Sequence, residues 1–451
     1  MQQHIDRQYT TQPLQVDASE TASCSGVRSR FADSADVTAL LAAFCFFLSA
    51  VEYMLPKPLP FMRLGIANLP ILLAVDMLPL GWYMALAAAK VVGMSIISGT
   101  LFSYVALFSL VGTIVAALTM RGLWKLGGRW ISHIGVSIAG AVISNAVQML
   151  IARYVIFGTV AWLIAPVFLA TGLVTGTLMG LFAEAFAASS TWYGCAAGRM
   201  GEQAMTSLIV DDPEDASQRD IRRRQKRTSA RSQRAQQARL VRRERYESAF
   251  EPWGSALAGV VAAAIFLFQH GIFIKMLFFL VFILWAWAAG KRFSLLATMM
   301  VSLSIIAANL LLPSGRVLVR LGTFAITERA LVDGIAKALT FEGLLYLSKA
   351  SIVPGLRLPG LFGDLVANAF RYYDRIIEFK GRIRPAMLIR DIDRLLAVVW
   401  TRDMLGSAAQ GSRVEIAQPG RARMMRSLLL LALVVAISGG FVVLGNLLAR
   451  G

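Results

Sequence analysis

The chain has 451 residues, of which 57% are hydrophobic and only 16% are charged, and its mean hydropathy is +0.61. A soluble protein of this length carries about a quarter charged residues, so the composition excludes an ordinary soluble fold. The net charge of +18 would suggest a nucleic-acid binder among soluble proteins. In a membrane protein it follows from the excess of Lys and Arg that is kept on the cytoplasmic side.

Apolar runs long enough to cross a bilayer recur along the chain. They lack the alternation of apolar and polar residues that strands of a membrane barrel show. The predicted fold class is therefore all-α, a polytopic membrane protein. Residues 1–36 show no signal-peptide pattern, and we expect them to form a disordered cytoplasmic tail. The three cysteines and three histidines are too few and too scattered for a metal site.

A first block, residues 37–190, is predicted to be a six-helix membrane domain. The second of its segments is short and contains two prolines, Pro70 and Pro79, so we expect it to be kinked, tilted or buried by its neighbours. The expected spans are 37–54, 66–79, 81–98, 101–120, 134–156 and 161–187.

A basic linker, residues 191–250, follows and contains the run from Arg222 to Arg227. Translocating this run would be very unfavourable, so we expect it to be a cytoplasmic topology anchor that contacts anionic lipid. A docking arm for an acidic partner is the alternative. Aromatic residues for base stacking are not interleaved with the arginines, and we expect no nucleic-acid partner. The predicted location is the cell inner membrane, with the N-terminus and the linker cytoplasmic.

A second block, residues 251–451, is predicted to contain about five spans and a charged cytoplasmic stretch at about 355–423. Apolar residues in this stretch recur at spacings of three and four, as in amphipathic helices that lie on the membrane or on a partner. They are Leu361, Leu365, Ala369 and Tyr372, followed by Ile389, Ile392 and Leu396.

Ionisable and amide side chains inside the bilayer are concentrated in the first block. Such groups usually face a cavity or a partner helix. One interpretation is structural: Lys90 pairs with Asp76 or Glu184, and amides hold helices together. The other is a pocket for a small polar or anionic ligand, and both stay open at this point. The candidate ligand contacts are Arg63, Asn68, Lys90, Asn145 and Gln148.

Small residues at four-residue spacing let membrane helices approach closely. Gly172, Gly176 and Gly180 form a doubled G-x-x-x-G in the sixth expected span. Ala39 and Ala43 form an A-x-x-x-A in the first. We expect both sets to pack against other helices.

No catalytic residues are predicted. The phosphate-binding motif G-x-x-x-x-G-K-[ST] does not occur, so the chain has no ATP site of that kind. The cluster Asp211–Asp215 has the D-D-x-x-D spacing of prenyl-transferring enzymes, but Pro213 interrupts it and no second copy exists. A solvated acidic patch is the expected role, and no metal is expected.

The first block resembles a known family through Arg63–Asn68, through Gly135–Ala141 with Asn145 and Gln148, and through Gly172–Gly180. It looks like the Gx transporter family, also labelled heptaprenyl diphosphate synthase component I, over about residues 37–187. That family is similar in outline to the substrate-capturing S subunits of energy-coupling-factor (ECF) transporters. The resemblance implies that Ala39 and Ala43 pack against a transmembrane T subunit.

The second block looks like such a T subunit, through the run Ile326–Gly334 before a long apolar helix. T subunits usually carry Ala-Arg-Gly motifs on helices that dock on ATPases, and here only Arg421-Ala422-Arg423 is present. The resemblances together imply a fused component of an ECF-type importer, with ATP used only by separate ABC-type ATPase subunits. The alternative is a membrane accessory subunit of a polyprenyl diphosphate synthase in isoprenoid quinone biosynthesis.

Overall fold

The protein is a multi-pass helical membrane protein in a computed structural model. Among the described residues, the only strands are the antiparallel hairpin of β1 (Val317–Leu321) and β2 (Phe324–Thr327). Six described helices are long and apolar enough to cross a membrane, or seven if one bent pair forms a single span. The structure describes residues 34–54, 65–158, 161–199, 230–269, 271–291, 294–311, 315–321, 324–353, 356, 359–379, 387–409 and 421–448.

The first block contains five of the six candidate spans. Helix α6 continues into a π-helical turn over Arg153–Phe157. The helices of the block are α2 (Ser34–Met54), α3 (Leu69–Leu73), α4 (Leu80–Ser98), α5 (Tyr104–Gly127), α6 (His133–Ala152) and α7 (Ala161–Ser189).

The expected segment 66–79 is far shorter than a span. It consists of a 3₁₀ turn, Ile66–Asn68, and the five-residue α3. Pro70 lies in the first turn of α3, where the missing N–H does no harm. Pro79 is the extended residue that precedes α4, so the two prolines leave room for little helix between them. All five residues of α3 are buried by their neighbours.

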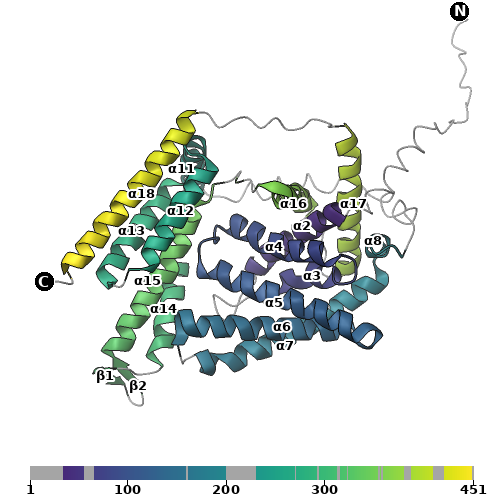
Figure 1. The fold of residues 1–451 in the computed structure, drawn as a ribbon, viewed down its shortest axis with the longest axis horizontal. Coiled ribbons are helices and arrows are strands. Elements are labelled where there is room, and N and C mark those ends of the chain that lie inside the picture. The colour runs from purple at the N-terminus through teal and green to yellow at the C-terminus, as the bar shows by residue number, and fades with distance from the viewer. Residues whose placement is uncertain are drawn as a thin grey trace, which may run out of the picture.

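The basic helix α11 (Ala230–Ala249) belongs to the predicted linker and meets α12, the first helix of the second block, at 96°. Gly290 and Val353 lie against α11, so the ends of α13 and α15 meet it at one end of the block, here named the basic end. The hairpin lies at the opposite end (Figure 1). The helices are α11 (Ala230–Ala249), α12 (Pro252–Leu267), α13 (Ile272–Ala288), α14 (Leu295–Leu310), α15 (Glu328–Ser351), α16 (Gly360–Phe379), α17 (Leu388–Ala409) and α18 (Arg421–Leu448).

The helices of the two blocks run in different directions. In Figure 1, α4 to α7 run across the view, whereas α12, α13 and α18 cross it steeply. The two sets of helices therefore cross instead of running side by side.

Amphipathic helix α16 lies on the first block rather than on lipid or a separate partner. It packs along α2, where the ring of Phe46 is 5.4 Å from that of Phe370 and 6.0 Å from that of Tyr373. Leu365, Ala369 and Tyr372, on its predicted apolar stripe, are buried. The partner that the amphipathic pattern indicated is thus another part of the same chain.

Helix α17 is joined to the first block by one carboxylate. Asp393, only 5% exposed, accepts hydrogen bonds from Ser190 Oγ (2.5 Å) and from the backbone N–H groups of Thr191 (3.1 Å) and Trp192 (2.9 Å). These N–H groups open the short helix α8 (Thr191–Ala196), where an acceptor is otherwise missing. Asp393 therefore ties the second block to the end of the first.

The small residues identified in the sequence lie at helix contacts. A Cβ built on Gly176 would lie 3.0 Å from Ile138 Cα, and one on Gly180 would lie 2.6 Å from Ile134 Cα. Gly172 adjoins Asn145 in the same way. This face of α7 thus packs closely on α6. Ala39 and Ala43 are fully buried and share a helix face with Phe46, which contacts α16.

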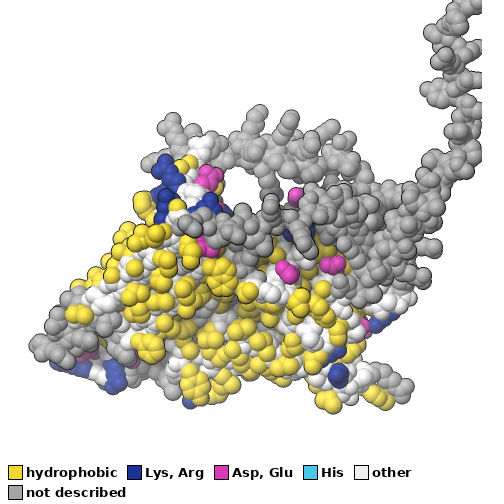
Figure 2. All heavy atoms as spheres, turned by 45° about the horizontal axis from the view of Figure 1, so that its top comes forward, with side chains coloured by type: hydrophobic (Ala, Val, Ile, Leu, Met, Phe, Trp, Pro, Cys, Tyr) yellow, Lys and Arg dark blue, Asp and Glu magenta, His cyan; other side chains and the backbone are white. Residues whose placement is uncertain are grey.

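Many large hydrophobic side chains of the described residues are exposed. Figure 2 shows hydrophobic side chains over most of the visible described surface, with Lys and Arg gathered towards its edges. In water such a surface would be an aggregation hazard, whereas lipid tails solvate it. Several polar groups of the spans, Lys90 and Asn145 among them, are nevertheless buried inside.

Replacing Asp393 by alanine should lower the free energy of unfolding by at least about 2 kcal/mol, because buried N–H donors lose their acceptor. Asp393→Asn, which keeps one acceptor oxygen, should have a smaller effect. Asp374→Ala, on the exposed face of α16, is the matched control and should stay within about 0.5 kcal/mol. Unfolding of the detergent-solubilised chain measures all three, and equal stability of the Asp393 and Asp374 alanine variants would contradict the tie.

Candidate functional site

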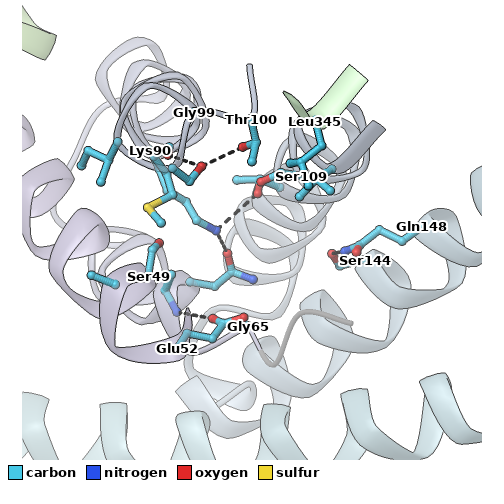
Figure 3. A pocket seen from close by; sticks show the side chains of 18 of the residues that line it. Ser49, Glu52, Gly65, Lys90, Gly99, Thr100, Ser109, Ser144, Gln148 and Leu345 are labelled. Atoms are coloured by element: carbon cyan, nitrogen blue, oxygen red, sulfur yellow. Dashed lines mark hydrogen bonds between the residues drawn. The ribbon is translucent and has the colours of Figure 1, made fainter. Parts of the chain in front are cut away.

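A cavity of about 790 Å³ lies where the first block meets α14 and α15 of the second. Its wall combines apolar side chains with hydroxyl, amide and charged groups. Figure 3 shows Lys90, Ser109, Ser144 and Gln148 around it, with Leu345 of α15 at one edge. A volume of this size is typical of sites for small molecules.

Lys90 is the cation that the described part of the first block contributes to the cavity wall. It is 4% exposed on α4, and its ammonium group donates hydrogen bonds to Asn68 Oδ1 and to Thr113 Oγ1, the latter at 3.3 Å. Asn68 ends the 3₁₀ turn that follows Gly65, whose φ of 82° few other residues adopt readily. The turn thus places an amide oxygen against the lysine.

Glu52 brings a carboxylate to the same region from the end of α2. It is 6% exposed and accepts a hydrogen bond from the backbone N–H of Ala67 at 3.4 Å. Glu52 lines the cavity together with Lys90 and Asn68. Sequence reasoning missed it, although a carboxylate closing an otherwise apolar helix was a visible signal.

Asn145 and Gln148 line the cavity from α6. Asn145 Nδ2 donates to the carbonyl of Phe168 on α7 at 2.8 Å, which is a contact between helices. Gln148 Nε2 donates to Ser144 Oγ at 2.9 Å on its own helix and lies against Gly112 of α5. Both amides therefore belong to the cavity wall, and Asn145 also joins two helices.

The other predicted polar residues lie elsewhere. Arg63 is outside the described residues. Asp76 accepts hydrogen bonds from Tyr193 Oη and Arg199, each at 2.8 Å, and Glu184 accepts one from the backbone N–H of His133. The suggested pairing of Lys90 with Asp76 or Glu184 is therefore replaced by the Asn68 and Thr113 contacts. Burial and the adjacent Asp76 carboxylate raise the pKa of Tyr193.

The second block supplies a wall of the cavity that the sequence reasoning did not assign. Thr298 Oγ1 lies 3.4 Å from Glu342 Oε2 and 2.6 Å from Tyr346 Oη, and the Lys349 ammonium is 5.0 Å from the centre of the Tyr346 ring. Lys291 also lines the cavity. Glu342 and Lys349, two of the charged residues of α15, lie among apolar residues as Lys90 does in α4.

The wall offers hydrogen-bond donors, acceptors and cations beside apolar surface. This combination suits binding and orienting a small amphiphilic molecule. Within the part of the chain that the structure describes, no group of three His, Cys, Asp or Glu residues could hold a metal ion. The cluster Asp211–Asp215 lies outside that part.

Comparison with protein families gives two matches. Residues 41–186 match the family model of heptaprenyl diphosphate synthase component I. The resemblance predicted for the first block is thus confirmed. Residues 255–353 match a model described as a domain of unknown function, DUF8519. No curated protein and no solved structure matches the chain.

Asn145→Ala separates a packing role from a ligand role. Hydrogen bonds between membrane helices stabilise them by about 0.6 kcal/mol on average and about 1.7 at most. We expect the variant to lose no more than that in unfolding free energy while ligand binding falls. Thr177→Ala, whose hydroxyl bonds only its own helix at Leu173, is the control. A loss above about 3 kcal/mol would assign Asn145 a mainly structural role.

Proposed function

We propose that the chain is a fused membrane component of an ECF-type importer. The first block captures a small ligand, and the second block couples that capture to a separately encoded ABC-type ATPase. The observation that carries the proposal is the cavity itself, whose walls come from both blocks. A ligand held there touches both units, as capture and coupling within one chain require.

The chain's orientation supports uptake rather than export. The exposed arginines of α11 lie at the basic end of the second block, so by the positive-inside rule we place this end in the cytoplasm. Lys291 and Lys349 line the cavity near this end, where Lys291 contacts Ile352 just beyond the end of α15. A ligand that enters the first block from outside would then leave towards the cytoplasm.

Helices α16 and α17 are suited to coupling. Their buried faces hold α2 and α8, and Asp393 fixes the second of these contacts. Leu361 and Ile377 on α16 remain exposed, at 83% and 42%. An ATPase that moved these helices would move the first block with them. The chain thus has a mechanical route from a cytoplasmic partner to the ligand cavity.

Lys90→Met tests the capture role. The purified full chain should retain a small molecule from cell extract, detectable by mass spectrometry after denaturation. Loss of a charged hydrogen-bond donor should reduce retention at least about tenfold. Lys125→Met, an exposed lysine of α5 outside the cavity, should change retention less than about twofold.

Two results together would contradict import. One is that mild-detergent purification of the tagged chain recovers no ATPase. The other is that a deletion strain takes up every molecule retained by the purified chain at the wild-type rate. Retention that Lys90→Met does not alter would contradict the assigned site.

A second candidate function follows from the matched family description, heptaprenyl diphosphate synthase component I. In this case the chain would be a membrane accessory subunit of a separate, catalytic synthase. Chain elongation by that synthase, measured with and without this chain, separates the two functions. An increase in product length or rate that survives Asp211→Asn and Asp212→Asn favours the accessory role, and an unchanged reaction favours import.

A further inference from the structure

The cavity wall carries more cations than anions. Five charged residues line it, namely Lys90, Lys291 and Lys349 with Glu52 and Glu342. Both carboxylates already take part in hydrogen bonds, Glu52 from Ala67 N–H and Glu342 from the Thr298 hydroxyl. Glu342 also interacts electrostatically with Lys349 and offsets part of its charge, but three lysines against two carboxylates leave the wall with a net positive charge.

Lys349 is held at the junction of the blocks. The loop after α4 packs on its backbone, where a Cβ on Gly99 would lie 3.2 Å from Lys349 Cα. In addition, the backbone N–H of Phe102 donates to Ser348 Oγ at 3.1 Å. The Lys349 ammonium lies over the Tyr346 ring, and among the described residues it forms no ion pair. An anion could therefore take it as a partner without breaking a salt bridge.

Lys291 lines the same cavity at the basic end. Its ammonium donates to the carbonyl of Ile352 at 3.2 Å, just beyond the end of α15. Burial lowers the pKa of Lys291, and the nearby Arg243 lowers it further. A bound anion would stabilise the charged form of Lys291. Protonation of the lysine and binding of the anion therefore favour each other.

The rest of the wall selects against a purely polar anion. Apolar side chains from both blocks line the same cavity: Met94, Ile97, Val105, Val301, Phe341 and Leu345. An inorganic anion would leave this surface without a partner, whereas an apolar body would fill it.

We propose that Lys291 and Lys349 form a subsite on the second block for the carboxylate or phosphate of a small amphiphilic anion. The apolar body of the ligand lies against the first block. This inference rests on the proposed capture function and deepens it, because it gives the coupling unit a direct contact with the ligand. Release towards the basic end then follows the gradient of positive charge.

The test uses the full chain in phosphatidylcholine nanodiscs, with radiolabelled phenylbutyrate as the anionic probe and phenylbutanol as its neutral counterpart. Lys349→Gln and Lys291→Gln should each weaken phenylbutyrate binding at least about fivefold and leave phenylbutanol binding unchanged. Lys337→Gln is the matched control. Lys337 also lies on α15 but donates to Asn309 outside the cavity, so we expect less than about twofold change.

Three results would overturn the subsite. One is wild-type affinity in both glutamine variants, one is an equal loss of the neutral probe, and one is no binding of phenylbutyrate to the wild-type chain. Lys90→Gln, measured in parallel, distinguishes a failure of the subsite from a failure of the capture function. If Lys90→Gln weakens the probe while the second-block variants do not, capture stands and the subsite falls.

A last arm identifies the source of the anionic group. Nanodiscs that contain phosphatidylglycerol present an anionic lipid phosphate next to the cavity. Displacement of phenylbutyrate by this lipid, lost in Lys349→Gln, supports the subsite with a lipid headgroup as its occupant. Unchanged binding supports it with a free solute. Matching gel-filtration profiles of all variants exclude unfolding as the cause of a loss.

Discussion

The burial of α2 is the constraint on which the rest of the structure depends. The helix has almost no exposed surface from Val37 to Leu48, and 72% of its apolar window is buried inside the protein. Helix α4 covers one side, with Gly93 leaving room for the ring of Phe46, and α16 covers another. A helix that is apolar all round can be covered by protein or by lipid, and here protein covers most of it. The two blocks meet along this buried helix.

This contact decides where the polar residues of the spans can go. With α16 and α17 holding the first block by α2 and α8, the α4–α5 loop reaches the end of α15. The side chains around Lys90 then face α14 and α15 across one cavity instead of facing lipid. Charged groups in a membrane protein are stable when they face such a space or a partner. The cavity and the junction of the two blocks are consequently the same place.

Much of this was predictable from local sequence rules. Long apolar runs give the spans, and the three- and four-residue spacings in 355–423 correctly indicate α16 and α17. Lys90, Asn68, Asn145 and Gln148 were selected because polar groups are unfavourable in lipid, and all four line the cavity. The short α3 differs from its expected span because Pro70 and Pro79 bound it.

Local sequence rules could not predict the contacts between the blocks. The spacing of apolar residues shows which face of a helix is buried, but not which element buries it. Amphipathic α16 could equally have lain on lipid. Asp393 did carry a signal, since it falls four residues after Ile389 and three before Leu396, within the apolar stripe. A carboxylate at such a position needs a buried donor, but the sequence does not say that the donors open α8. The tertiary arrangement alone brings them together.

A cryo-electron microscopy map of the full chain in a lipid nanodisc, purified without added ligand, tests the central claim most directly. We expect α16 to cover α2 without intervening lipid, and the cavity to hold density in contact with both Lys90 and α15. A map in which α2 faces lipid and the two blocks are separate would contradict it. So would a ligand bound to the first block at a site that α14 and α15 do not reach.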